Sequence, residues 1–234
     1  MTPETKFHSL VLGLTVVVMF WVIVLLVPYV QEAPFMQAPL VQYPLVQASL
    51  GAIFALLLSA GIYGLIAKGL VVVLRRSRWL KAKLLGPYYM EGTWAGHFIG
   101  HQNDIRYVVE VFEQDFSSLT IMGKSYTVAH DMHAQWTSEA TYLDVEHARL
   151  IYASSLDVFS RKITVQSIVV FQLERESAND APHAMEGYTA DLDDGTRIWI
   201  REEKINEQAM AHRDAIRQAK EITNRNLANL PDTR

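Results

Sequence analysis

The sequence predicts a membrane-anchored, all-β protein. It consists of a hairpin of two transmembrane helices, an antiparallel β-barrel of about eight short strands and a C-terminal helix. Three observations lead to this prediction. Two long apolar runs fill the first third of the 234 residues, and five cations without an acid follow between Arg75 and Lys83. From about Gly86 to Lys204 the side chains alternate with period two, which is typical of strands.

The two apolar runs are each long enough to cross a membrane. The first, from Phe7 to Val30, has no charged side chain, and the second, from Leu45 to Leu74, has only Lys68. At about 1.5 Å per helical residue, either can span a hydrocarbon core of about 30 Å. The first run is too long for a typical signal peptide, so we interpret it as a retained helix. The segment between them, Gln31 to Pro44, has three prolines and no Lys or Arg, which predicts a turn on the non-cytoplasmic side.

The basic segment from Arg75 to Lys83 orients the protein. Lys and Arg resist translocation and are attracted to anionic lipid headgroups. We therefore expect both termini and the barrel on the cytoplasmic side. Small residues in the second helix form a ridge that lets helix backbones approach closely. Either the first helix of the same chain or another protomer could pack there, at Gly51, Ala55, Ser59, Ala60 and Gly64.

The domain after the basic segment is expected to be all β. Within 105–116, alternation places Arg106 and Glu110 on one face and Tyr107 and Val109 on the other. Asp193-Asp194-Gly195 is a strong hairpin signal. Short antiparallel strands with turns between them favour a sandwich or a closed barrel. The strands are expected at 92–100, 105–116, 117–124, 132–138, 141–145, 149–155, 163–174, 185–191 and 196–202.

The predicted boundaries are 1–85 for the membrane region with its basic segment, 86–204 for the barrel, and 205–234 for the helix and tail. From Ile205 to Ala219 apolar residues recur at three- and four-residue steps, which indicates an amphipathic helix. This helix could lie on the barrel or join another protomer.

Composition and motifs exclude several kinds of chemistry. The absence of cysteine rules out disulfides, zinc thiolate sites and a cysteine nucleophile, and the net charge of −4 does not suggest a nucleic-acid polymer as partner. No phosphate-binding glycine loop and no nucleophile elbow are present. The pairs His97 with His101 and His130 with His133 have spacings seen in metal sites, but we interpret them as surface or core histidines. We expect no catalytic residues, no metal and no cofactor.

Aromatic and basic residues recur along the predicted strands. Base stacking needs aromatic faces and phosphate binding needs guanidinium groups, so this mixture suits a nucleotide. Ordinary core aromatics with outward-facing charges would give the same composition. The residues are Tyr107, Tyr126, Trp136, Tyr152, Tyr188 and Trp199 with Arg106, Lys124, Arg149 and Arg197.

The order of these parts resembles a family of bacterial antiphage effectors. Two transmembrane helices and a basic segment precede a barrel that opens with Gly92-Thr93-Trp94-Ala95-Gly96. It closes with Gly187-Tyr188-Thr189-Ala190-Asp191 and Gly195-Thr196-Arg197-Ile198-Trp199-Ile200-Arg201. This is similar to the effectors of cyclic-oligonucleotide signalling (CBASS) that carry a lipocalin-like barrel. The resemblance covers about Phe7 to Lys204.

The resemblance implies a function. The barrel would bind a cyclic di- or oligonucleotide made by a partner nucleotidyltransferase, and binding would control homo-oligomerisation of helices in the bacterial inner membrane. Disruption of that membrane would arrest the infected cell. A related arrangement has the opposite sign, with the nucleotide holding the effector inactive. The resemblance carries over Trp94, Tyr188, Thr189 and Arg197 as matched positions. Together with aromatic and basic residues of the strands, they predict a ligand site of Trp94, Arg106, Tyr107, Tyr126, Trp136, Tyr152, Tyr188, Thr189, Arg197 and Trp199.

Two other functions fit the same architecture. One is a membrane-anchored, lipocalin-like carrier of an apolar ligand. The other is a ligand-free scaffold that docks partners through its C-terminal helix. An almost wholly apolar barrel interior would favour the carrier, whereas inward-facing Arg, Thr and Tyr would favour a nucleotide.

Overall fold

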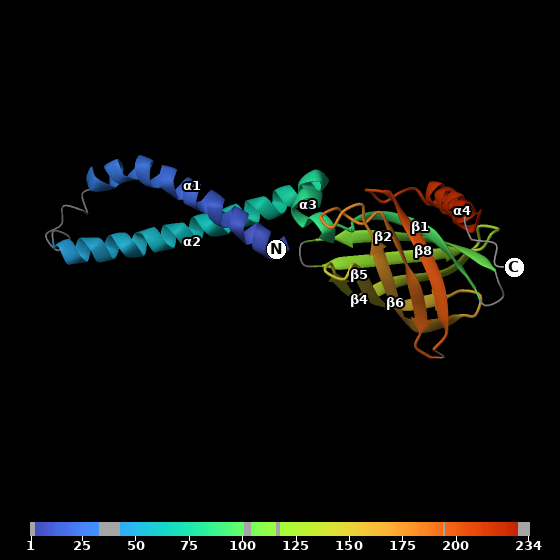
Figure 1. The fold of residues 1–234 in the computed structure, drawn as a ribbon. Coiled ribbons are helices and arrows are strands. Elements are labelled where there is room, and N and C mark those ends of the chain that lie inside the picture. The colour runs from blue at the N-terminus through green and yellow to red at the C-terminus, as the bar shows by residue number, and fades with distance from the viewer. Residues whose placement is uncertain (1–2, 33–42, 101–103, 116–117, 194, 229–234) are drawn as a thin grey trace. The chain divides into compact units, whose positions relative to one another are not determined.

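The chain forms two compact units, and the boundary between them in the sequence falls between Leu84 and Leu85. The computed structural model describes residues 3–32, 43–100, 104–115, 118–193 and 195–228. The first unit is helical and the second contains the barrel and the last helix (Figure 1). Each unit is described separately below.

The first unit contains the two predicted apolar helices, α1 (Pro3–Glu32) and α2 (Pro44–Arg76). Their segments Glu4–Leu25 and Gly51–Leu74 are long and apolar enough to cross a membrane, judged by length and composition. In the first segment Val11 and Thr15 are buried and in the second Leu74, so the other apolar side chains lack close protein partners along most of the length. The predicted turn between the helices falls largely in 33–42, outside the described residues.

The two helices contact each other near the start of α1. Val11 and Thr15 are buried there, and His8 Nδ1 lies 2.8 Å from the hydroxyl of Tyr63 in α2. A Cβ added at Gly51 or Gly64 would meet no atom within 4 Å. These two members of the small-residue ridge are therefore not packed against α1.

The basic segment is helical on both sides of Ser77, because Arg75 and Arg76 end α2 and the remaining cations lie in a short helix. α3 spans Arg78–Leu85, and a 3₁₀ turn, η3, follows at Gly86–Tyr88. Gly86 has φ 56°, a conformation that glycine adopts without strain, and it allows the chain to leave the helix directly into the turn.

The second unit is a closed antiparallel barrel of eight strands, as predicted. Each strand pairs with the next in the sequence, and β1 pairs with β8 to close the ring. The strands are β1 (Gly92–Ile99), β2 (Ile105–Gln114), β3 (Leu119–Tyr126), β4 (Met132–Asp144), β5 (Arg149–Val158), β6 (Ile163–Glu174), β7 (Ala184–Asp191) and β8 (Arg197–Asn206).

Several predicted strand bounds differ from the structure, and two of these differences have a clear physical cause. The segments expected at 132–138 and 141–145 form one strand, β4, whose register shifts between Ser138 and Ala140. Such a bulge adds a residue and interrupts the alternation, which made one strand resemble two. β8 continues to Asn206, and helix α4 begins only at His212 and ends at Ala228. The helical periodicity therefore began in the end of a strand.

The apolar face of β2 does not point into the barrel. Tyr107 and Val109 lie on the outside, in a cluster with Ala215 and Ala219 of α4, while Glu110 and Phe112 point inward. The alternation was predicted correctly, but the presence of α4 gives β2 two buried faces.

Helix α4 packs on its own barrel, against β1 and β2. The small residues Ala215 and Ala219 are fully buried, which allows the helix to approach the sheet closely, and Ile216 and Ile222 are nearly so. This answers the question that the sequence left open, because the apolar face of α4 is used within the chain.

Candidate functional site

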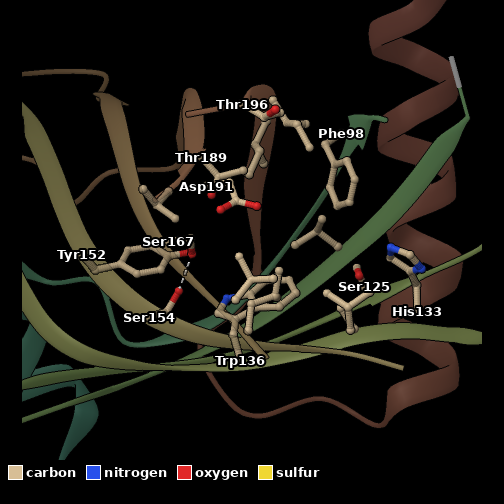
Figure 2. A pocket seen from close by; sticks show the side chains of 18 of the residues that line it. Phe98, Ser125, His133, Trp136, Tyr152, Ser154, Ser167, Thr189, Asp191 and Thr196 are labelled. Atoms are coloured by element: carbon tan, nitrogen blue, oxygen red, sulfur yellow. Dashed lines mark hydrogen bonds between the residues drawn. The ribbon is translucent and has the colours of Figure 1, made fainter. Parts of the chain in front are cut away.

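A cavity of about 200 Å³ lies inside the barrel. Residues of all eight strands line it, together with Arg161 from the turn between β5 and β6. Figure 2 shows its labelled side chains pointing inward from opposite walls. A closed barrel provides such a site because every second side chain of each strand faces the interior.

The wall of the cavity is partly apolar. Three rings, those of Phe98, Trp136 and Tyr152, offer flat faces to a ligand. Aliphatic residues fill the space between them and supply most of the remaining wall: Val108, Ala134, Leu156, Val158, Val165, Val169, Ile198 and Ile200.

Hydroxyl groups and the carboxylate of Asp191 form part of the polar wall. Ser154 and Ser167 are buried, and their Oγ atoms are 3.0 Å apart (Figure 2). The Oγ of Ser125 is buried and has no hydrogen-bond partner among the described residues. Thr189 and Thr196 also line the cavity. Ser125 is thus a donor and acceptor available to a ligand, because a buried hydroxyl is normally paired.

Charged groups gather around His133 and Arg161 in the cavity wall. The pKa of the His133 imidazole is lowered by burial and then by the positive charge of Arg106, so the ring is neutral at pH 7. Arg106 forms a 2.5 Å ion pair with Asp104. Arg161 lines the cavity while remaining exposed to solvent. It is therefore the cation best placed to meet an anionic group.

A buried carboxylate holds two of the rings in the cavity wall. Oε1 of Glu110 accepts hydrogen bonds from Trp136 Nε1, at 2.8 Å, and from the Tyr152 hydroxyl, at 2.6 Å. The indole crosses β3 at Gly123, where an added Cβ would lie 2.0 Å from the ring. Gly123 leaves the space that lets Trp136 reach Glu110.

Glu202 is also fully buried inside the barrel, beside Glu110. Both of its carboxyl oxygens, and Oε2 of Glu110, lack hydrogen-bond partners among the described residues. Burial raises the pKa of Glu110 to about 7, although the bonds from Tyr152 and Trp136 oppose the rise. Burial and then the charge of Glu110 raise the pKa of Glu202 well above its usual value. Two adjacent carboxyls in a dry interior cannot both ionise cheaply, so at least one holds a proton at neutral pH.

The structure brings together only some of the residues predicted to bind a ligand. Trp136, Tyr152 and Thr189 line the cavity. Trp94 points into the barrel but is fully buried in the core outside the cavity, with its Nε1 donating to the carbonyl oxygen of Met90 at 2.9 Å. Arg106 on β2 is the cross-strand neighbour of the cavity residue Phe98 on β1, and its charge lowers the pKa of His133.

The other predicted residues lie on the outer surface of the barrel. Tyr107 and Tyr126 are buried beneath α4, where the Tyr126 hydroxyl is 3.2 Å from His212 Nδ1. The remaining three form an outer cluster of Tyr188, Arg197 and Trp199, in which the Arg197 guanidinium lies 5.0 Å from the Tyr188 ring centre. Sequence spacing indicates which residues share a face, but not which face closes around the interior.

Sequence reasoning missed several cavity residues because it searched for aromatic rings and cations. The missed groups are the hydroxyls of Ser125, Ser154 and Ser167, together with Arg161 and His133. The carboxyls Glu110 and Glu202 were also missed. The sequence contained a signal for Glu110, because it lies two residues from Val108 and two from Phe112, and such residues share one face of a strand. Among the described residues, no group of three or more histidine or acidic side chains is placed to hold a metal ion.

No protein-family model matches this chain, and neither the curated proteins nor the solved structures contain a match.

Proposed function

We propose that this chain is a non-enzymatic membrane effector of antiphage defence whose barrel binds a cyclic di- or oligonucleotide. The supporting observation is the cavity, which combines aromatic faces and hydroxyl groups, including the unpaired hydroxyl of Ser125, with Arg161 in its wall. Aromatic faces stack on bases, hydroxyls bond to base edges and ribose, and a guanidinium pairs with phosphate. A partner nucleotidyltransferase would supply the ligand.

The cavity volume limits how such a ligand would bind. Pockets for drug-sized ligands span about 300–1,000 Å³. A cavity of about 200 Å³ suits one base with part of its ribose. The rest of a cyclic dinucleotide would lie nearer the solvent, where Arg161 and the Arg106–Asp104 pair are found.

The helices would provide the response. In the proposal they span the bacterial inner membrane as a hairpin, with both termini and the barrel in the cytoplasm. Gly51 and Gly64 have open space beside them, which supports contact with another protomer. The ligand would shift assembly only if it bound the assembled and resting states with different affinities. Tighter binding to the assembled state makes the nucleotide an activator, and tighter binding to the resting state makes it a restraint.

Calorimetry tests the binding step. The full chain in nanodiscs is titrated with a panel of cyclic di- and trinucleotides, and saturable binding of one member is the expected result. Arg161→Ala should then weaken that binding by about 1.5–3 kcal/mol, the value of a charged hydrogen bond. Arg213→Ala, which removes an exposed cation from α4, is the matched control and should bind like the parent. A folded sample that binds no member of the panel contradicts the proposal.

A growth assay tests the helix step. Ser59→Leu and Gly64→Leu should abolish toxicity in cells that make the ligand while leaving nucleotide affinity unchanged. Leu65→Ile, at an exposed position next to the ridge, is the control and should remain toxic. If both ridge variants arrest cells as the parent does, the ridge is not an assembly surface.

A second candidate is a carrier of a small apolar ligand. The aliphatic residues of the cavity wall and its modest volume favour this function. Saturable binding of an apolar fluorescent dye that no cyclic nucleotide displaces would support the carrier over the receptor. The scaffold has no comparable support, because the apolar face of α4 is already buried on β1 and β2.

A further inference from the structure

The outer face of the barrel carries an apolar row that crosses five strands. Its members are direct neighbours across successive strand pairs from β4 to β8. The two ends of the row are 61 % and 60 % exposed. The row consists of Tyr142, Ile151, Val170, Tyr188 and Trp199.

A second row of small and apolar residues lies beside the first. It runs Ala140, Ala153, Ile168, Ala190 and ends at Arg197, whose guanidinium stacks on Tyr188 of the first row. We call the two rows together the apolar stripe. Outward positions of an antiparallel barrel normally carry polar side chains. A continuous apolar patch with polar borders indicates an interaction surface.

The polar rows that border the apolar stripe differ from each other. One border carries Thr137, Ser155 and Gln166, with the exposed Glu139 accepting a hydrogen bond from the Ser155 hydroxyl. The other border carries charges in a regular order. From β4 to β8 it reads acidic, basic, neutral, acidic, basic: Asp144, Arg149, Gln172, Glu186 and Arg201. Within the chain Glu186 already pairs with Arg201 at 2.7 Å and Asp144 with His147 at 2.8 Å, so Arg149 is the charge of this border without an ion pair among the described residues.

This order of charges is complementary to its own reverse. A two-fold axis along β6 exchanges the β4 and β8 ends of the surface and keeps each row opposite itself. Arg149 then meets the partner subunit's Glu186, and Gln172 meets its own counterpart. An axis perpendicular to the strands would instead place the charged border against the border that holds Glu139, which offers no basic partner to Glu186. The charges therefore favour the first arrangement.

We propose that the apolar stripe is an interface with a second copy of this chain. The two sheets pack face to face through β5, β6 and β7, because the curvature of the barrel turns β4 and β8 away from the contact plane. Ile151, Val170 and Tyr188 form the centre, and the two Arg149–Glu186 pairs lie at its edge. Arg149 makes no ion pair with any residue that the structure describes, so it is available to the partner.

This interface goes beyond the proposed function. The apolar stripe lies on the opposite side of the strands from the cavity. The proposed interface therefore does not depend on which ligand the cavity binds. It assigns pairing to the barrel in addition to the helices. It also gives a role to Tyr188, which the cavity does not use.

Disulfide cross-linking of the full chain in bacterial membranes tests the interface. The chain has no cysteine, so one introduced thiol reports on one position. Val170→Cys and Ile168→Cys lie beside the two-fold axis and should each give a disulfide-linked dimer on mild oxidation. Met122→Cys, on the outer face of β3, is the matched control and should remain monomeric although the helices tether it equally. If neither β6 variant forms a dimer, or if the control links as well as they do, the proposal is overturned.

Exchanging the charges of Arg149 and Glu186 tests whether the partner is a second copy of this chain. Combined with Val170→Cys, Arg149→Glu should lower dimer yield about tenfold, because the substitution acts twice across a two-fold interface. Glu186→Arg should do the same, and the double variant Arg149→Glu with Glu186→Arg should restore the parental yield. Rescue requires both sides to come from this chain. Loss of dimer in the double variant would indicate a different protein or a lipid on this surface and would overturn the proposal.

Discussion

The two buried carboxyls predict that the barrel becomes less stable as the pH rises. The pKa of Glu110 is raised from 4.5 to about 7 by burial, so the folded barrel binds a proton more tightly than the unfolded chain does. Stability from this group is complete below pH 4.5 and is lost as the pH rises through about 7. Burial also raises the pKa of Glu202 well above its usual value of 4.5, so this group adds a further loss of stability that likewise begins where the unfolded chain ionises.

The size of the effect follows from the pKa difference. A change from 4.5 to about 7 corresponds to a loss of about 3 kcal/mol in the free energy of unfolding between pH 4.5 and 8. This is a substantial share of the 5–15 kcal/mol typical of a folded protein, so the change in denaturation midpoint should be easy to measure.

A variant without the two ionisable groups isolates this term. In Glu110→Gln with Glu202→Gln, the amide oxygen at position 110 can still accept hydrogen bonds from Trp136 and Tyr152. Urea unfolding of the full chain in detergent is followed by near-ultraviolet circular dichroism at pH 5 and pH 8. We expect the parent and the variant to differ little at pH 5, and the variant to be more stable at pH 8 by at least about 3 kcal/mol, because the contribution of Glu202 adds to that of Glu110. Equal pH dependence of the two proteins would refute the reasoning, because it would show that the carboxyls are solvated or already paired.

Three further predictions follow from the packing. Gly123→Ala should push the Trp136 indole away from β3, destabilise the barrel by about 1–3 kcal/mol and shift the tryptophan emission; unchanged emission would show that the indole does not cross this glycine. Ala219→Glu should lower the free energy of unfolding by about 2–4 kcal/mol by placing a charge under α4, whereas Lys220→Glu, at an exposed position, should change it little; equal effects would mean that α4 is not docked. Arg197→Ala should leave nucleotide affinity in calorimetry unchanged, because this cation is outside the cavity; a tenfold loss would move the site to the outer face.

Much of the fold could be predicted from the sequence because the pattern of apolar residues is set locally. Long uncharged runs such as Phe7 to Val30 are compatible with few structures other than a helix in lipid. The strongest strand, β6, has the predicted bounds Ile163–Glu174, since its apolar and polar residues alternate without interruption. β4 was divided in two because a bulge adds one residue, and such a bulge depends on pairing with β5.

The candidate site was less accessible to sequence reasoning. Trp136, Tyr152 and Thr189 were predicted and line the cavity. Tyr107 and Tyr126 were predicted with the same logic, and they lie under α4. An aromatic ring on a strand is equally compatible with the interior of a barrel and with a contact beneath a helix, so its type carries no information about the side it takes.

The sequence by itself determined the order of parts, the period of each element and the absence of cysteine chemistry. Tertiary structure decided which face of each strand is inside, that α4 covers β1 and β2, and that Glu110 reaches both Trp136 and Tyr152. It also decided that Gly123 leaves space for an indole from the next strand. The physical reason is that periodicity reflects each residue's bonds to its own neighbours in the chain. Contacts between residues far apart in the sequence depend on the strand register and on the way the barrel closes.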